Sequence, residues 1–389
     1  MSAVVLSSKI RKFGVEVFTG LELKKMEMER CGRKVYNLSI GTPDSPAPDE
    51  VRRALSEAAD EPDAWKYALF DIPEMIQALT GHYRDRYGVS VLPEQITSVA
   101  GTQTGLTHAL LVLCDPGDTI LIPDPCYPGF LSSAYTAGVN AVYYPLLREN
   151  SFMPDLFSIP ADAAKAAKVI VVNFPSNPIG CTVRDGFFDE LVRWARANDV
   201  FVIHDGAYRD LVFDLDRGTS FLEAEGADEV GIELFSLSKS FCITGARIGF
   251  AVGNTEAVKA IRTLREHIDF GMFIPLQRAA AAALSLPKSY TDDLCGIYRK
   301  RRDVFIDGLR RVGWDADAPD GSIFCWCRLP EGYEDSEEFG DILLEKSGVL
   351  CAPGAFFGPN GRQYVRFALV EEPDILTDAV NAIKESGIL

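Results

Sequence analysis

Runs of consecutive apolar residues alternate with helix-like segments through the middle of the chain, and this alternation restricts the possible folds more than any other feature. The β-branched run at 168–173 (KVIVVN) is typical of a strand that is buried on both faces of a parallel sheet. The segment Phe187–Asn198 that follows has the apolar spacing of a helix. The sequence therefore predicts an α/β fold of three layers, with helices covering both faces of a mostly parallel sheet. The other strands expected in this sheet are 119–122, 140–144, 200–204 and 231–237.

The apolar run at 248–252 differs from the others in its connection. It follows the strand at 231–237 after a segment that is too short to hold a crossover helix. We therefore expect it to be an antiparallel neighbour of that strand, which makes the sheet mixed. The sequence also predicts helices at 17–31, 49–59, 73–87, 104–114 and 127–137 and a short strand at 35–40.

The pattern of elements changes near residue 290, where a more charged segment begins. We expect a large central domain at 47–290 and a smaller α+β domain at 291–389, with residues 1–46 forming an N-terminal arm and part of the smaller domain. One long helix that begins near Tyr290 would link them. The C-terminal elements expected are helices at 298–312 and 335–347 and strands at 322–328, 348–351 and 364–370.

The chain of 389 residues carries a large excess of acidic side chains. It has 39 Lys and Arg against 56 Asp and Glu, a formal net charge of −17. Such a chain repels phosphate backbones, so we expect no nucleic-acid partner. No run of about 18 apolar residues occurs, and no long apolar stretch follows the first basic residues, so neither a membrane span nor a secretory signal is expected.

Nine cysteines are scattered along the chain without a regular spacing. In a protein of this size they are typical of reduced, mostly buried thiols, and we expect a cytoplasmic protein. Cys325 and Cys327 are close in sequence, but neither a second pair nor a nearby histidine accompanies them. The sequence therefore predicts no metal site.

Polar side chains follow several of the predicted strands, at the points where the strands end. Asn177 comes after the strand at 168–173, Asp205 and Tyr208 come after the strand at 200–204, and Lys239 comes after the strand at 231–237. Ligands of open parallel sheets bind beyond the carboxyl ends of the strands, so these residues and Tyr127 are expected at one rim. A ring-shaped cofactor that carries a phosphate fits this set better than a dinucleotide.

Lys239 is the most informative of these residues. It lies in the segment SLSKS at the end of an apolar strand, among small polar neighbours. Burial would lower the pKa of its amine, and a neutral amine is a nucleophile that forms a Schiff base with an aldehyde. The alternative is an ordinary surface lysine in a loop.

Four other rim residues have two readings each. Asp205 could keep a pyridine nitrogen protonated, which makes the ring an electron sink, or it could cap a helix. Asn177 and Tyr208 could donate hydrogen bonds to a ring oxygen, or serve as a turn former and a packed aromatic residue. Tyr127 could stack on the ring face or simply pack.

A phosphate would need hydrogen-bond donors, and two segments could supply them. Gly101 and Thr102 precede a predicted helix, whose N-terminus favours an anion. Ser236 and Ser238 flank the lysine segment, and Arg247 lies between two glycines at the entry to the strand at 248–252. An arginine there suits bidentate phosphate binding, although a surface ion pair is the alternative.

Arg366 lies among apolar residues in the predicted strand at 364–370. A buried guanidinium needs an anionic partner, because an unpaired buried charge is costly. The α-carboxylate of a substrate would serve as a planar partner, and an internal salt bridge is the alternative.

These residues, in this order, resemble the fold-type I aminotransferases that use pyridoxal 5′-phosphate. The resemblance covers nearly the whole chain, and the text between the motifs is most similar to prokaryotic LL-diaminopimelate aminotransferases and related alanine or aspartate aminotransferases. The motifs that carry it are NLSIGTPDSP, KYALFDIPEM, GTQTGL, DPGDTILIPDPCYPGF, VVNFPSNPIG, HDGAYRDL, SLSKSFCITGARIGF and YVRFALV.

The resemblance implies a role for each matching residue and a seven-stranded mixed sheet with a small domain that closes over the substrate. Lys239 would form the Schiff base and shuttle the proton, and Asp205 would pair with the ring nitrogen. Gly41 and Arg366 would hold the substrate α-carboxylate, with Asn177 beside it. The expected ring contacts are Asn177, Tyr208 and Tyr127; the expected phosphate contacts are Gly101, Thr102, Ser236, Ser238, Arg247 and, from the neighbouring subunit of a homodimer, Tyr67.

Four positions depart from the family pattern. Ala246 stands where a tryptophan is usual, and Cys242 stands where an asparagine is common. Gln103 begins a Gln-Thr pair in place of the Lys-Glu of the diaminopimelate group, and Asp71 replaces a glycine. None of these positions is the lysine, the ring-nitrogen acid or the carboxylate arginine, so the departures concern the choice of amino donor.

The predicted reaction is ping-pong transfer of an amino group from an L-amino acid to a 2-oxo acid such as 2-oxoglutarate. A β-eliminating lyase on the same scaffold is one alternative, since it needs the same lysine and aspartate. A cofactor-binding regulator without catalysis is another, although the acidic chain leaves no room for a basic DNA-binding module. A nucleotide-dependent dehydrogenase is disfavoured because no G-x-G-x-x-G segment follows an early strand.

Overall fold

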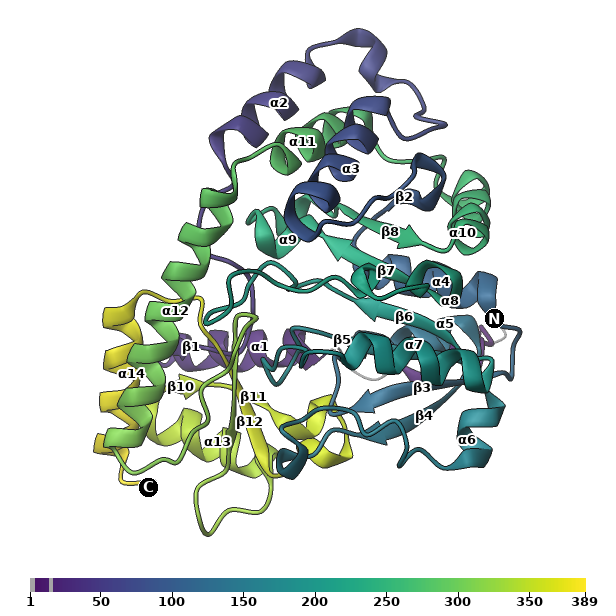
Figure 1. Cartoon of the computed structure of the whole chain (residues 1–389). Helices are drawn as coiled ribbons and strands as arrows, with labels where there is room; N and C mark the ends of the chain where they lie inside the picture. The colour runs from purple at the N-terminus through teal and green to yellow at the C-terminus, as the bar shows by residue number, and fades with distance from the viewer. Residues whose placement is uncertain (1–3, 14–16) are drawn as a thin grey trace.

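A mixed sheet of seven strands forms the centre of the structure, a computed structural model that describes residues 4–13 and 17–389. The strand order is β2-β8-β7-β6-β5-β3-β4 (Figure 1). Strand β8 pairs antiparallel with β7 and with β2, and the other neighbours pair parallel, which confirms the predicted mixed sheet. The strands are β2 (Ile96–Val99), β3 (Thr119–Asp124), β4 (Asn140–Pro145), β5 (Ala167–Asn173), β6 (Phe201–Asp205), β7 (Gly231–Ser236) and β8 (Gly249–Gly253).

The sheet is covered on both faces because its central strands are apolar on both sides. In β5, Val169 and Val171 belong to the same apolar cluster as residues of α4, α5 and α10, whereas Ile170 and Val172 join the cluster of α7. Successive side chains of a strand point to opposite faces, so one continuous apolar run supplies both cores. The predicted three-layer α/β fold is confirmed. The helices are α4 (Thr102–Leu113), α5 (Gly129–Ala137), α7 (Phe187–Asn198) and α10 (Thr255–Ile268).

A smaller group of elements follows the long helix α12 (Lys288–Arg311), which begins two residues before the predicted Tyr290. In Figure 1 this helix runs from the region of α11 down to α14. A three-stranded antiparallel sheet of order β11-β12-β9 packs with the helices into one large apolar cluster. These elements are β9 (Phe324–Arg328), β11 (Ala352–Pro353), β12 (Tyr364–Ala368), α13 (Ser336–Ser347) and α14 (Pro373–Ser386).

Residues near the two ends of the chain meet in a two-stranded parallel sheet. Strand β1 (Tyr36–Asn37) pairs with β10 (Val349–Leu350), so the strand expected at 35–40 is real but shorter than predicted. This pairing places the N-terminal segment beside the C-terminal elements. The division of the chain at residues 47 and 291 stays a prediction. The remaining helices are α1 (Val17–Arg30), α2 (Asp49–Ala59), α3 (Pro73–Tyr87), α6 (Ala161–Ala166), α8 (Ala227–Val230), α9 (Leu237–Ser240) and α11 (Ile274–Leu284).

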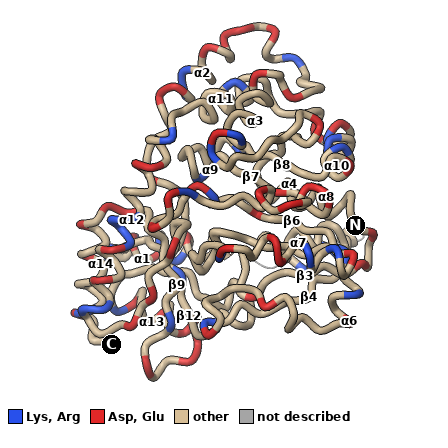
Figure 2. The backbone as a smooth tube through the Cα atoms, in the orientation of Figure 1, with Lys and Arg blue, Asp and Glu red and all other residues tan. Residues whose placement is uncertain are grey.

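Acidic side chains recur along the outer elements, for example at α8, as Figure 2 shows. All nine cysteines are free thiols, and only Cys31 is exposed. Within residues 4–13 and 17–389, no group of three His, Cys, Asp or Glu side chains is arranged to hold a metal ion. No helix in the same ranges is both long and apolar enough to cross a bilayer.

Candidate active site

One cavity of about 210 Å³ lies at the carboxyl ends of the parallel strands and brings together almost every residue singled out above. The elements that reach it are far apart in the chain, from the segment around Gly41 to β12. Of the predicted site residues, only Tyr67 lies elsewhere. Those that line the cavity are Gly41, Gly101, Thr102, Tyr127, Asn177, Asp205, Tyr208, Ser236, Ser238, Lys239, Arg247 and Arg366.

Lys239 lies on the single turn of α9, directly after the buried strand β7. Its Nζ donates a hydrogen bond of 2.6 Å to the carbonyl oxygen of Gly41. Burial, together with the positive charges of Arg366 and Arg247, lowers the pKa of this amine to about 8. A lysine in this setting is partly neutral near physiological pH, so the reading as an ordinary surface lysine is wrong.

Asp205 is the last residue of β6 and is buried. The backbone N–H of Ala207 donates to its Oδ1 at 3.2 Å, and the side chain of Thr102 is a further hydrogen-bond partner. Burial raises the pKa of this carboxyl to about 6, and these two hydrogen bonds oppose the shift. Asp205 is therefore mainly ionised at neutral pH and could accept a hydrogen bond from a protonated ring nitrogen.

Asn173 orders the residues beside Asp205 and was missed by the sequence analysis. Its Nδ2 donates to the backbone oxygen of Asp205 at 2.7 Å, and its Oδ1 accepts from the backbone N–H of Asn177 at 2.8 Å. Asn177 is in turn a hydrogen-bond partner of the Tyr208 phenol, whose pKa burial raises. The signal was available, because Asn173 is the polar residue that ends the apolar strand β5.

Gly101 and Arg247 form one side of the cavity. Gly101 has a φ of +87°, and a Cβ atom at this position would lie 2.5 Å from a terminal nitrogen of Arg247. Only glycine lets the guanidinium approach this closely. Thr102 then begins α4, and the N–H groups of a first helical turn have no intrahelical acceptor. The guanidinium and the helix start together suit an anion such as a phosphate.

Arg366 is fully buried in β12 without a carboxylate partner among the described residues. One terminal nitrogen donates to Asn177 Oδ1 at 2.9 Å and the other to the Ser39 carbonyl oxygen at 2.6 Å, while Nε has no partner. The guanidinium carbon lies 4.0 Å from the centre of the Phe324 ring. Burial lowers the pKa of Arg366 to about 10. A buried cation that lacks an anion favours the binding of one, and the reading as an internal salt bridge is wrong.

Tyr67 is 80% exposed and lies outside the cavity, against the ring of Phe270 at 5.3 Å between ring centres. Its predicted contact with the phosphate of a neighbouring subunit stays a prediction. The cavity wall contains further residues that the sequence analysis did not identify as site residues. They are Phe18, Ile40, Asn173, Ala207, Thr244 and Phe324.

Of the four departures from the family pattern, only Gln103 lines the cavity, where its Oε1 accepts a hydrogen bond of 3.0 Å from the Tyr127 hydroxyl. Asp71 instead accepts from the backbone N–H of Ser98 at 2.8 Å. Cys242 has a φ of +54° and its thiol has Tyr290 as a hydrogen-bond partner. Gln103 is therefore the departure that can touch a bound molecule directly.

Comparisons with known proteins agree on one family. Residues 33–383 match the family described as "Aminotransferase class I and II". An LL-diaminopimelate aminotransferase of Syntrophobacter fumaroxidans is 36% identical over 385 residues, which cover 98% of this chain and 99% of that protein. The L-glutamine--4-(methylsulfanyl)-2-oxobutanoate aminotransferase of Bacillus subtilis is 36% identical over 379 residues, covering 97% and 95% respectively.

Solved structures give the same result. The structure of substrate-bound BacF from Bacillus subtilis superimposes with a TM-score of 0.95 at 34% identity, over 98% of each chain. A probable N-succinyldiaminopimelate aminotransferase from Thermus thermophilus gives a TM-score of 0.91 at 34% identity, over 95% of this chain and 100% of that one. The resemblance seen in the sequence motifs is confirmed over nearly the whole chain: the protein belongs to the class I and II aminotransferase family.

Proposed function

We propose that this aminotransferase binds pyridoxal 5′-phosphate in the cavity described above and uses Lys239 as its reactive amine. The observation that carries the proposal is that three groups line the same cavity. They are the Lys239 amine with its lowered pKa, the buried carboxylate of Asp205, and the guanidinium of Arg366, which has no carboxylate partner among the described residues. An amine, an anion for a ring nitrogen and a cation for a substrate carboxylate are the parts that transamination requires.

The residues present fit this cofactor. Asp205 would pair with the ring nitrogen, Asn177 and Tyr208 would donate to the ring oxygen, and Tyr127 would pack on the ring face. The guanidinium of Arg247, which packs against Gly101 beside the start of α4, suits a phosphate. When bound, the cofactor supplies an aldehyde that condenses with amines and a ring that withdraws electrons from the substrate α-carbon. The proposed phosphate contacts are Gly101, Thr102, Ser236, Ser238 and Arg247, joined by Tyr67 of the neighbouring subunit.

The protein groups then perform three tasks. Arg366 and the backbone at Gly41 hold the α-carboxylate, which fixes the α-carbon relative to Lys239. The neutral Nζ of Lys239 would accept the α-proton as a general base and then, as a general acid, donate it to the carbon that the cofactor's aldehyde supplies. Asp205 keeps its negative charge beside the ring nitrogen. Water would then release the carbon skeleton of the L-amino acid as a 2-oxo acid while the amino group stays on the cofactor, and a second 2-oxo acid such as 2-oxoglutarate would take up that group by the reverse path.

Two kinds of amino donor have support. LL-diaminopimelate is the first, because several relatives carry that name, and alanine or aspartate are related possibilities. A neutral donor such as glutamine is the second. The charged side chains in the described cavity wall all have proposed roles above. The wall residues without such a role, among them Phe18, Ile40 and Gln103, carry no charge. The name of one relative, which includes L-glutamine, agrees with this lining.

A rapid-mixing experiment tests the proposal. The holoenzyme is mixed in turn with LL-diaminopimelate, glutamine, alanine and aspartate, without any oxo acid, and the cofactor absorbance is followed. We expect a fast spectral change with one donor class and one equivalent of oxo acid per active site. In a parallel reaction with cysteine, whose thiol is a β-leaving group, continuous release of ammonia, sulfide and pyruvate would instead identify a β-eliminating lyase. A wild-type protein that binds no pyridoxal phosphate would refute the proposal altogether.

Replacement of Arg366 by lysine is expected to raise KM roughly 100-fold for both the amino acid and the oxo acid, because both carry the carboxylate that a planar guanidinium pairs with. The value of kcat should change less than the value of KM. The matched control is Arg301→Lys, since Arg301 is equally buried but pairs with Asp44 and does not line the cavity. Equal KM values in the Arg366 variant and the wild type would contradict the assignment.

We further infer a cytoplasmic homodimer with shared active sites. Support comes from a group of exposed apolar side chains around Tyr67 that a single chain leaves uncovered, namely Trp65, Leu69, Phe70, Ile268 and Phe270. Clusters of this kind mark interfaces between proteins. We also propose that the smaller C-terminal group of elements closes over the substrate, as expected for the family. The long helix α12 would connect this group to the elements of the central sheet.

A further inference from the structure

A buried carboxylate, that of Glu233, lies behind the site without taking part in it. Glu233 is on β7, fully buried, and paired in register with His204 of the neighbouring strand β6. It does not line the cavity. A buried charge is costly unless hydrogen bonds and an opposite charge compensate it. The partners of the Glu233 carboxylate therefore indicate its role.

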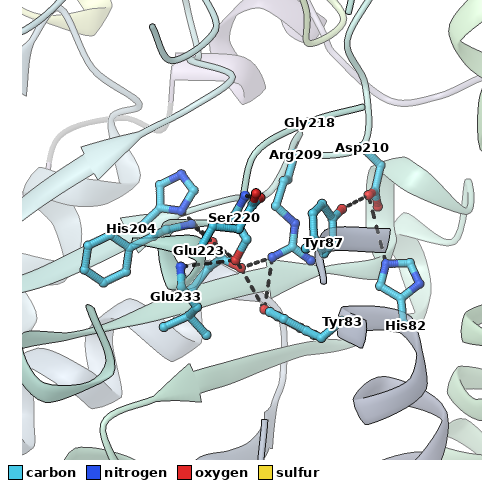
Figure 3. Close-up of polar contacts among 12 residues, drawn as sticks. His82, Tyr83, Tyr87, His204, Arg209, Asp210, Gly218, Ser220, Glu223 and Glu233 are labelled. Carbon is cyan, nitrogen blue, oxygen red and sulfur yellow. Dashed lines mark hydrogen bonds and ion pairs between the residues drawn. The ribbon is translucent and has the colours of Figure 1, made fainter. Parts of the chain in front are cut away.

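Glu233 accepts an unusual number of hydrogen bonds (Figure 3). The Tyr83 hydroxyl donates at 2.7 Å and the Phe221 backbone N–H at 2.8 Å. The Ser220 hydroxyl lies 3.1 Å from both carboxylate oxygens, and His204 Nδ1 lies 2.9 Å from one of them. The guanidinium of Arg209 completes the set as an ion pair. The carboxylate is thus the hub of a network that joins α3, β6 and two loops.

Arg209 is held mainly by packing, since two of its three guanidinium nitrogens have no hydrogen-bond partner among the described residues. It is fully buried, and its guanidinium carbon lies 4.0 Å from the ring centre of Tyr87 and 4.3 Å from that of Phe235. Its backbone oxygen is so close to Gly218 that a Cβ atom at position 218 would collide with it. One arrangement of this side chain is therefore strongly favoured by packing.

The two basic partners of Glu233 lie at the two ends of one short segment. His204 directly precedes Asp205, and Arg209 directly follows Tyr208. Between them the chain makes a tight turn, in which the Arg209 N–H donates to the Gly206 carbonyl oxygen at 3.0 Å and the Gly206 N–H donates to that of Leu234 at 2.9 Å. A single carboxylate therefore fixes both ends of the segment that presents Asp205 and Tyr208 to the cavity.

We propose that Glu233 is a positioning residue of this aminotransferase, which sets the places of Asp205 and Tyr208 through His204 and Arg209. The inference rests on the proposed function of Asp205 and Tyr208. Stability alone is a poor reason for the network, because apolar side chains of similar volume are often at least as stabilising as a buried ion pair. Hydrogen bonds to charged groups have fixed directions, and functional groups must be held within about 0.5 Å.

Two tyrosines provide a matched test. Tyr83 and Tyr144 are both buried, and each donates one hydrogen bond of 2.7 Å, to Glu233 and to the Val171 carbonyl oxygen respectively. The Tyr83 hydroxyl also accepts a hydrogen bond of 3.0 Å from Arg209, so Tyr83→Phe should lower the melting temperature somewhat more than Tyr144→Phe. Only Tyr83→Phe, and more strongly Glu233→Gln, should change the visible circular dichroism of the bound cofactor. We expect Glu233→Gln to lower kcat roughly tenfold with little change in KM, since Arg366 is untouched.

Failure of this inference can be distinguished from failure of the proposed function. Wild-type dichroism and kcat in both Glu233→Gln and Tyr83→Phe would overturn the inference, and so would an equal loss of kcat in Tyr144→Phe. If Glu233→Gln does not fold, the comparison of the two tyrosine variants decides. Failure of the proposed function would show itself differently, as wild-type protein without any cofactor absorbance.

Discussion

Replacement of Lys239 by alanine is expected to abolish turnover, with a loss of at least about 10⁴-fold in kcat. No other amine is placed to substitute for it, because Lys239 is the only lysine among the described residues that line the cavity. A small primary amine added to the solution should restore part of the activity by occupying the space that the side chain leaves. Steady-state assays with and without this amine measure both effects.

Two further measurements check the same assignment. Borohydride reduction of the holoenzyme, followed by peptide mass spectrometry, should find the cofactor on the peptide that contains Lys239. The control variant is Lys168→Ala, which removes an exposed lysine at the opposite end of a central strand and should retain wild-type activity. A label on another peptide, or full activity in Lys239→Ala, would show that the reactive amine is elsewhere.

The low pKa of Lys239 gives the expected pH dependence. The folded-state pKa of about 8 lies below the ordinary 10.5, so the neutral amine dominates above about pH 8 and is lost as the pH falls through that value. The rate at which the cofactor-free protein captures pyridoxal phosphate should therefore rise with pH around a midpoint near 8.

The strands of the central sheet could be predicted from the sequence where burial on both faces produces an uninterrupted run of apolar residues. Strand β5 is apolar on both faces, and its pattern alone identifies it as a central parallel strand. Strand β2 was missed because its residues include Thr97 and Ser98, although all four are buried. Ser98 is tolerated there since Asp71 and Arg265 satisfy its hydrogen bonds, and such distant partners cannot be read from a local pattern. Helix α14 could have been found from its first-turn proline and apolar spacing.

The site followed from one geometric rule, that the ends of parallel strands share a rim. The rule placed Asp205 and Lys239 at the rim that the cavity occupies, because Asp205 ends β6 and Lys239 lies on the short helix that follows β7. It could not locate Phe18, which reaches the cavity from α1, more than two hundred residues before Lys239. The network of Glu233 was equally hidden. An acidic residue inside an apolar strand signals a buried partner, but nothing local shows that Tyr83 and Arg209 provide it.

Asp205→Asn is expected to slow the half-reaction with an amino acid roughly 10²–10³-fold while leaving the fold intact. Asparagine has nearly the same shape and can still accept the Ala207 hydrogen bond through its amide oxygen. It lacks the negative charge that keeps a ring nitrogen protonated, so electron withdrawal from the α-carbon is weakened. Single-turnover stopped-flow measurements isolate this step from product release.

Asp124→Asn is the matched control for that variant. Asp124 also lies at the carboxyl end of a central strand, is buried, and has a pKa raised to about 6 by burial, but it accepts from the Asn360 backbone and does not line the cavity. Only Asp205→Asn should lose the fast step and shift the absorbance of the bound cofactor. Equal single-turnover rates in Asp205→Asn and the wild type would mean that another group, or none, controls the ring nitrogen.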